Sequence, residues 1–312
     1  MNLPEALLAN VRSGRVVLFL GSGASKGAKN AYGGDLPTGI ELSSLLYTRF
    51  LGDDFNNQPL AWVADLAISE SDLVTVQDFI GQQFRDCRPA DFHYLIAAFR
   101  WRGIVTTNYD RIVETVYDLA DKPIQTLVPF ISNQERVDEK LRTERSLALV
   151  KLHGCITRTH DSQLPLILTI DQYVTHRKFR SRLFDMFKEW AYEYPVVFVG
   201  YSLVDQDVRS ILLELTDELS ISRPRYYVVS PTMSEQEMRF WDGRRGSLLR
   251  GSFSDFLKAL EQEIPRDRRI LQVVNDTTRH PIESKFVGDN SVNELITNAL
   301  KYDMDYIHSS MA

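Results

Sequence analysis

Short apolar runs rich in β-branched residues recur along this chain, and stretches with helical spacing separate them. This alternation is typical of βα units that build a parallel sheet. The runs show little polar alternation, which indicates strands covered by helices on both faces. The expected strands are residues 16–20, 103–107, 123–128, 147–152, 164–170, 195–201 and 226–230. We therefore predict an α/β fold with a Rossmann-like, mostly parallel sheet and helices on both faces.

The first two runs are separated by far more chain than one crossover helix needs. Most of that stretch has helical spacing, so we predict a small helical module inserted over residues 36–101. One helix is expected to begin at Thr38, because Thr38 and Glu41 have the spacing of a capping box. Further helices are expected around residues 59–68, 73–85 and 90–101.

The chain is expected to divide into a domain over residues 1–260 and a C-terminal extension over residues 261–312. The extension starts polar and irregular, and Ser291 and Glu294 then form a second capping-box pattern before an amphipathic stretch. We interpret that stretch as a helix that either docks on its own domain or contacts another subunit or partner. The charged segment 131–146 is expected to be an exposed loop or a surface helix.

Composition excludes several classes of protein. The formal net charge of -6 supplies no basic field for nucleic-acid binding, so direct binding of nucleic acid is not expected. Cys87 and Cys155 are the only cysteines and form no CxxC pair, so we expect neither a zinc ribbon nor another metal site. No run is long enough to span a membrane, and the cysteine usage fits a reducing cytoplasm.

Polar and glycine residues follow four of the expected strands, where a parallel sheet binds its ligands. After residues 16–20 come Gly21, Ser22, Gly23 and Ser25. Glycines there permit a tight turn whose N–H groups can hold a pyrophosphate, although tight turns also use glycine for steric reasons alone. A dehydrogenase fingerprint is disfavoured. Its third glycine would have to be at position 26, whereas the glycine here is Gly27.

The other three strand ends carry side chains that can do chemistry. Residues 103–107 lead into Asn108 and Asp110, which either contact a ligand or cap the next helix. Residues 147–152 lead into His153, either a structural histidine or a general base with a near-neutral pKa. Residues 195–201 lead into Ser202, Asp205 and Asp207, which either hold ribose hydroxyls or cap a helix.

In this order and spacing, GSGAS, TTNYD, KLHG and GYSLVDQD resemble the SIR2-like family, relatives of the sirtuins found especially in bacterial defence systems. The resemblance covers roughly residues 12–230. It implies NAD⁺ as the substrate. The residues that it implies as contacts of NAD⁺ are Gly21, Ser22, Gly23, Ser25, Thr107, Gly200, Tyr201, Ser202 and Asp205, and the catalytic ones are Asn108, His153 and Asp110.

The chain departs from protein-deacylating sirtuins at two points. Those enzymes carry a zinc module with four cysteines, and this chain has two. Their glycine-rich loop continues into a Pro-Asp-Phe-Arg stretch, whereas residues 36–39 here read LPTG. The defence-type branch of the family is therefore the closer resemblance.

The resemblance implies an enzyme that cleaves the bond between nicotinamide and ribose, giving nicotinamide and ADP-ribose or a cyclic ADP-ribose. It also implies antiphage defence by NAD⁺ depletion, gating of the activity, a homo-oligomer and a possible HerA-like ATPase partner. The chain has no GxxxxGK[ST] loop, so any ATPase would be another polypeptide. The alternatives are a protein deacylase or ADP-ribosyltransferase, a non-catalytic NAD⁺ or ADP-ribose sensor, and a nuclease subunit using Asp205 and Asp207.

Overall fold

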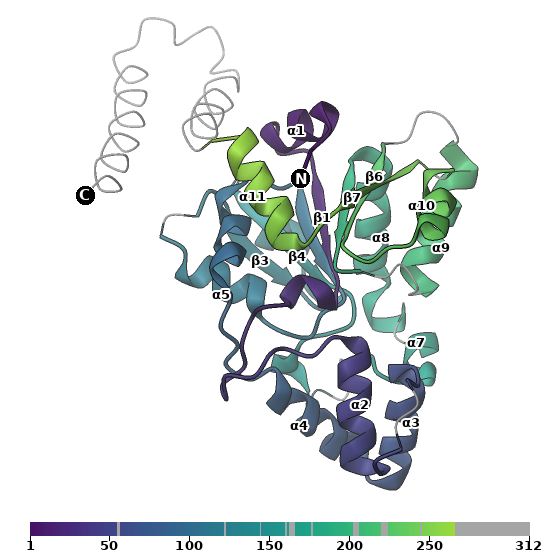
Figure 1. Ribbon diagram of the computed structural model, residues 1–312. Helices are drawn as coiled ribbons and strands as arrows, with labels where there is room; N and C mark the ends of the chain where they lie inside the picture. The colour runs from purple at the N-terminus through teal and green to yellow at the C-terminus, as the bar shows by residue number, and fades with distance from the viewer. Residues whose placement is uncertain are drawn as a thin grey trace, which may run out of the picture. The chain divides into compact units, whose positions relative to one another are not determined.

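Seven strands form one parallel sheet in the computed structural model of the protein (Figure 1). Their order is β3-β4-β2-β1-β5-β6-β7. The strands are β1 Val17–Leu20, β2 Gly103–Thr106, β3 Thr126–Phe130, β4 Ser146–Lys151, β5 Val196–Val199, β6 Tyr226–Ser230 and β7 Gly246–Arg250. The structure describes residues 1–265 except 55–56, 122, 144, 160, 162–165, 176, 202–205, 220–223 and 244.

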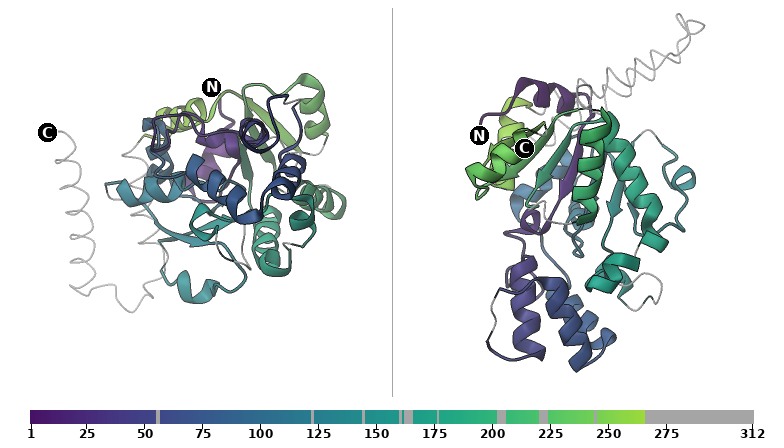
Figure 2. Two further views of the ribbon diagram at one scale, coloured as in Figure 1. Left: turned by 90° about the horizontal axis from the view of Figure 1, so that it is seen from below. Right: turned by 90° about the vertical axis from the view of Figure 1, so that its right-hand side faces the viewer.

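Helices cover both faces of the sheet, because right-handed crossovers that run in opposite directions from β1 lie on opposite faces. The connections after β4 and β5 carry the helices α8 and α9, which pack on one face (Figure 2, right). Their bounds are α8 Arg177–Glu193 and α9 Gln206–Leu219. The other helices between β3 and β7 are the short α6 Val137–Lys140, α7 Ile170–Thr175 and α10 Glu235–Asp242. Four further helices flank the strands along the chain. They are α1 Glu5–Arg12 before β1, η2 Asp91–Ala98 before β2, α5 Ile112–Leu119 after β2 and α11 Phe253–Glu263 after β7.

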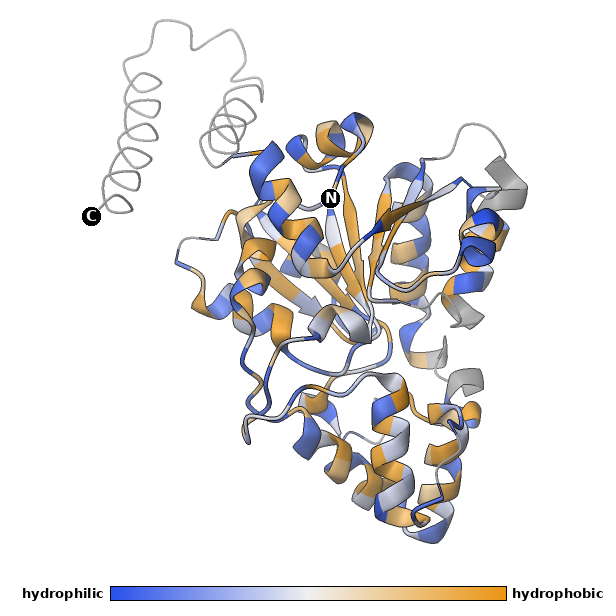
Figure 3. Ribbon diagram, in the orientation of Figure 1, coloured by the Kyte–Doolittle hydropathy of each residue, from blue (hydrophilic) through white to orange (hydrophobic). Residues whose placement is uncertain are grey.

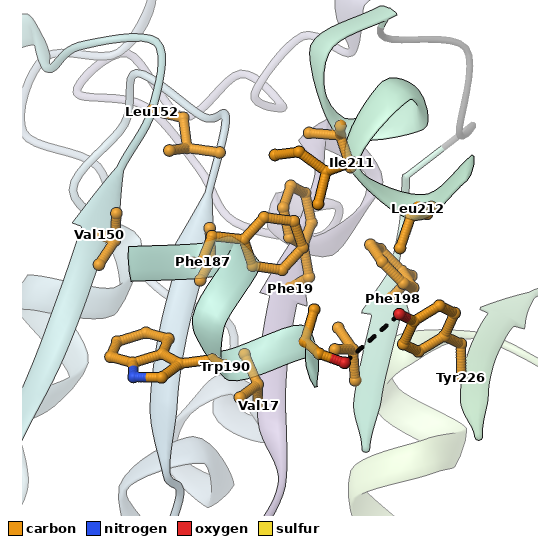
Figure 4. Packing of buried hydrophobic residues seen from close by; sticks show 14 of the residues in the cluster. Val17, Phe19, Val150, Leu152, Phe187, Trp190, Phe198, Ile211, Leu212 and Tyr226 are labelled. Carbon is orange, nitrogen blue, oxygen red and sulfur yellow. Dashed lines mark hydrogen bonds between the residues drawn. The ribbon is translucent and has the colours of Figure 1, made fainter. Parts of the chain in front are cut away.

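The core on the α8 face explains why the central strands are continuously apolar. Phe19 of β1 packs its ring 5.2 Å from Phe187 of α8 and 5.1 Å from Phe198 of β5 (Figure 4). All residues of β1, β2 and β5 are buried, and the strands are the most uniformly hydrophobic elements in Figure 3. This doubly covered sheet and its inserted helices confirm the predicted fold class.

A helical module follows β1 and its short turn η1 Ser22–Ser25. It consists of α2 Gly39–Phe50, α3 Leu60–Glu70 and α4 Leu73–Gln83, which share a core of their own (Figures 1 and 2). The capping box predicted at Thr38 is present, since the Thr38 N–H donates a 2.7 Å hydrogen bond to the Glu41 carboxylate. The segment expected as a helix over 90–101 is a 3₁₀ helix instead, η2.

One predicted strand is absent, and one observed strand was not predicted. Residues 166–169 are not a strand, and α7 begins at Ile170. Leu166 and Leu168 are buried in the core of the helical module, so this apolar run packs on helices rather than pairing in the sheet. Conversely, β7 was not predicted, because only part of this short edge strand is buried.

Residues Met1–Ala259 and Leu260–Ala312 are two separate compact units. Of the second unit the structure describes only residues 260–265. The terminal helix expected after Ser291 therefore lies outside the described residues.

Candidate functional site

Four sequence motifs leave the sheet at one level on four neighbouring strands. Leu20, the last residue of β1, pairs with Thr106 at the end of β2 and with Val199 at the end of β5. Thr106 in turn pairs with Lys151 at the end of β4. The segments GSGAS, TTNYD, HG and GY begin within two residues of these four positions. The register therefore brings all four to one stretch of the carboxyl edge of the sheet.

Asn108 is held at this edge by its side-chain amide. Its Nδ2 donates to the carbonyl oxygen of Gly21 at 2.9 Å and to Oγ of Ser25 at 3.1 Å. Because a carbonyl oxygen can only accept, the contact with Gly21 fixes the amide nitrogen of Asn108 toward the β1 turn. No donor to Asn108 Oδ1 is found among the described residues, and the residue is only half-buried. The amide oxygen can thus accept a hydrogen bond from a hydroxyl group of a ligand or from water.

Ser25 joins Asn108 to Asp110. Its hydroxyl accepts from the Asn108 amide and donates a 2.7 Å hydrogen bond to Oδ2 of Asp110. The other oxygen of Asp110 accepts from the N–H of Ile112 at 2.9 Å, at the start of α5. Ser25 and Asp110 are buried. Both residues hold the turn after β1 against the segment after β2. Asp110 also makes the helix-capping contact that the sequence offered as one of its two possible roles.

A buried ion pair that the sequence analysis missed lies beneath this cluster. Lys151 is 1% exposed, and its Nζ donates to Glu114 Oε1 at 3.1 Å and to the backbone carbonyl of Asp110. Burial is the largest single effect and would lower the pKa of Lys151, but the charges of Glu114 and its other acidic neighbours, with the Glu114 hydrogen bond, together outweigh it and the pKa is raised. A charged ammonium therefore supports the backbone of Asp110. A lysine within the apolar run LALVKL was the available signal for such a partner.

His93 is a second supporting residue that the sequence did not reveal. Its Nδ1 accepts from the N–H of Ala90 at 2.9 Å, and its Nε2 lies 2.8 Å from the carbonyl oxygen of Ala24. Only the neutral form with a proton on Nε2 satisfies both partners. Burial lowers the pKa of His93, which favours that form. His93 thus anchors the turn that carries Ser25.

The glycines of the β1 turn serve a close approach of two backbones. A Cβ on Gly21 would lie 2.5 Å from the carbonyl oxygen of Gly200, and one on Gly23 would lie 2.8 Å from its Cα. The N–H of Gly23 donates to that same carbonyl at 2.9 Å. Glycine is therefore required at both positions for steric reasons. Ser22 of the same turn is exposed.

His153 follows β4 at the same edge as Asn108. The N–H of the preceding residue, Leu152, donates to the carbonyl of Thr106 at 2.9 Å, so the β4 end is tied to the β2 end. The carbonyl of His153 accepts from Ile167 at 3.0 Å, and the residue is buried. Gly154 follows with a positive φ of 96°, which turns the chain sharply after the histidine.

The other residues expected to contact a ligand lie in different surroundings. Thr107 is half-buried, and its N–H lies 3.4 Å from the carbonyl of Leu20. The ring of Tyr201 packs 4.8 Å from the ring of Phe19, so this aromatic side chain belongs largely to the core. Ser202 and Asp205 lie outside the described residues.

A small cavity of about 10 Å³ lies within the polar cluster, which is the space of a single water molecule. Ser25, Asn108, Asp110, Glu114 and Lys151 are among the residues that border it, and His153 is not. Within the described part of the chain, no group of three or more His, Cys, Asp or Glu residues could hold a metal ion. No helix among those residues is long and apolar enough to cross a membrane.

Fold and strand-end geometry define an α/β protein with a candidate ligand site at the carboxyl edge of a parallel sheet. Residues 102–248, which include the segments of Asn108 and His153, match the family model of the SIR2-like domain. No curated protein matches the chain.

Two solved structures resemble the protein over most of its length. One is a Sir2 homologue in complex with NAD, with a TM-score of 0.53, 13% identity and coverage of 86% of this chain and 96% of that one. The other is a mutant Sir2 homologue in complex with 2′-O-acetyl ADP-ribose, with a TM-score of 0.50, 13% identity and coverage of 85% and 98%. At this identity the likeness shows a Sir2-type fold. Over residues 102–248 the chain is also similar to the SIR2-like domain.

Proposed function

We propose that this protein is an NAD⁺ glycohydrolase, which cleaves the bond between nicotinamide and ribose. The observation that carries the proposal is the register of β5, β1, β2 and β4, which brings the GSGAS, TTNYD, HG and GY segments to one edge. The two similar Sir2 structures are complexes with NAD and an ADP-ribose derivative, which supports the same substrate class here.

In the proposed reaction water adds to the anomeric carbon of the ribose as the bond to nicotinamide breaks, giving nicotinamide, ADP-ribose and a proton. Asn108 Oδ1 accepts from a ribose hydroxyl or from the attacking water, because its amide nitrogen is held by Gly21 and Ser25. His153 takes the proton as general base. If a group of the substrate attacks in place of water, a cyclic ADP-ribose forms.

Asp110 has a mainly positioning role in this proposal. Both of its oxygens accept protein hydrogen bonds, from Ser25 and Ile112, so it orients the Asn108 segment. Its carboxylate also contributes negative charge to the region where positive charge develops on the ribose. The proposed contacts of NAD⁺ remain Gly21, Ser22, Gly23, Ser25, Thr107, Gly200, Tyr201, Ser202 and Asp205.

The cellular role that we propose is antiphage defence by depletion of NAD⁺ in the cytoplasm. Such an activity requires gating. We propose a homo-oligomer and, as a candidate activator, a separate HerA-like ATPase. The extension over residues 261–312 is the proposed contact region for another subunit or partner, and residues 1–260, with the helical insertion 36–101, form the proposed catalytic domain.

The direct test is chromatography of NAD⁺ incubated with the full chain, with and without a candidate ATPase partner. Wild type is expected to release nicotinamide, and Asn108→Ala and His153→Ala are each expected to lower the rate by about a hundredfold or more. Arg250→Gln, a change of an exposed residue at the end of β7, serves as the matched control. Equal release by wild type and both site variants would refute the assignment.

The same assay separates the alternative functions. A deacylase would release nicotinamide only when an acylated lysine peptide is added. An ADP-ribosyltransferase would move labelled ADP-ribose onto protein. A sensor would bind NAD⁺ in calorimetry and leave it intact under every condition.

A further inference from the structure

A second and much larger cavity lies on the outer side of α5, away from the strand-end site. This cleft measures about 790 Å³ and is bordered by α4, residues 84–91, the exposed side of α5 and the short helix η3 Ile156–Arg158. Small-molecule sites typically measure about 300–1,000 Å³. The cleft therefore has the size of a nucleotide site, although neither Asn108 nor His153 borders it.

Three arginines border the cleft, namely Arg85, Arg88 and Arg111, and all three are exposed. Arg111 makes a loose ion pair with Asp118 at 3.7 Å. Among the residues that the structure describes, neither Arg85 nor Arg88 has an ion-pair partner. Their guanidinium groups are thus available, and a guanidinium binds a phosphate through two parallel hydrogen bonds.

Three carboxylates, Asp78, Asp86 and Asp91, border the same cleft and balance the formal charge of the arginines. A simple anion would gain little from such a balanced lining. A ligand that combines a phosphate with sugar hydroxyls uses both kinds of group, because carboxylates accept hydrogen bonds from hydroxyls.

Several of the other residues that line the cleft are apolar or aromatic, and they suit a planar base. Tyr94, Leu119 and Ile156 supply an aromatic ring and two apolar side chains to the cleft. Leu119 is 64% exposed, so it leaves apolar surface uncovered there. A planar base would cover this surface and stack on a ring.

From this lining we propose that the cleft is a second binding site, for a nucleotide of the monophosphate class. Arg88 and Arg111 hold the phosphate, the aspartates accept from the ribose hydroxyls, and the base lies on the apolar side chains. The cleft is linked to the strand-end segment only through the backbone, where the N–H of Ile156 donates to the carbonyl of Tyr109 at 3.1 Å.

The test is calorimetric titration of the full chain with AMP, with ribose 5-phosphate and inorganic phosphate as partial probes. AMP is expected to bind more tightly than either partial probe. Arg88→Gln and Arg111→Gln are each expected to weaken AMP binding by about tenfold or more, which corresponds to about 1.4 kcal/mol. Arg250→Gln, an exposed arginine that does not border the cleft, is the control.

Asn108→Ala distinguishes this cleft from the strand-end site, and it is expected to leave AMP binding unchanged. Loss of AMP binding in Asn108→Ala with retention in Arg88→Gln would overturn the proposal, as would no measurable AMP binding by wild type. Equal affinity for AMP and inorganic phosphate would overturn the nucleotide assignment. The readout is binding, so it is independent of whether the protein cleaves NAD⁺.

Discussion

The hydroxyl of Ser25 donates a 2.7 Å hydrogen bond to the carboxylate of Asp110 across 85 positions of sequence. It links the turn after β1 to the segment after β2, and it also receives the amide of Asn108. The candidate site at this edge of the sheet is thus a connected hydrogen-bond network. Its parts are expected to fail together when one link is removed.

Ser25→Ala removes the central link of that network. The buried Oδ2 of Asp110 loses its donor, which is expected to cost about 1–3 kcal/mol of stability, measured by urea denaturation. The proposed NAD⁺ hydrolysis is expected to fall by about tenfold or more, because Asn108 loses one of its two acceptors. Ser22→Ala, at an exposed position of the same turn, is the matched control for stability. Equal unfolding free energies for the two variants would contradict the role of Ser25.

Lys151→Met tests the ion pair beneath the site. It leaves the buried carboxylate of Glu114 without its partner and is expected to lower the free energy of unfolding by about 3–5 kcal/mol. The double variant with Glu114→Leu is expected to regain part of that loss, since the isolated charge is removed. Additive losses in the double-mutant cycle would show that the two side chains do not interact energetically.

The sequence predicted the central sheet well, because its signal is local. Val17–Leu20 and Val196–Val199 are buried on both faces, and continuous apolar runs are what such strands require. The run at 164–170 has a similar composition, but its Leu166 and Leu168 pack in the core of the helical module. Composition alone cannot tell which neighbour an apolar run will have, and that is why this prediction was wrong.

The candidate site could be predicted only as separate strand ends. Asn108 and His153 stood out because polar residues follow apolar runs. The contacts of Ser25 with Asp110, and of Lys151 with Glu114, depend on the strand register and on burial, which one sequence does not contain. His93 carries no motif, and only the position of the Ala24 carbonyl reveals its role.

Gly200→Ala tests the close approach of the two turns. Gly200 has φ of 58°, and a Cβ there would lie 2.2 Å from the backbone nitrogen of Ala24. Because that neighbour is backbone and cannot rotate away, we expect a loss of at least about 2–3 kcal/mol. Gly33 is the matched control, with φ of 80° and open space around its Cβ, and Gly33→Ala is expected to cost only about 1 kcal/mol. Similar melting temperatures for both variants would mean that the turns can separate freely.

The buried His93 is expected to make stability depend on pH. Its pKa in the folded protein lies below the usual value of 6.5, first because of burial, so the unfolded chain binds a proton more readily. The stabilisation is therefore complete above about pH 6.5 and is lost as the pH falls below it. A proton on Nδ1 would also face the N–H of Ala90, which is its donor in the neutral form. His93→Asn is expected to destabilise the protein at pH 8 by about 1–3 kcal/mol and to flatten the fall of the melting temperature between pH 7 and pH 5. An unchanged slope in this variant would assign the acid sensitivity to other groups.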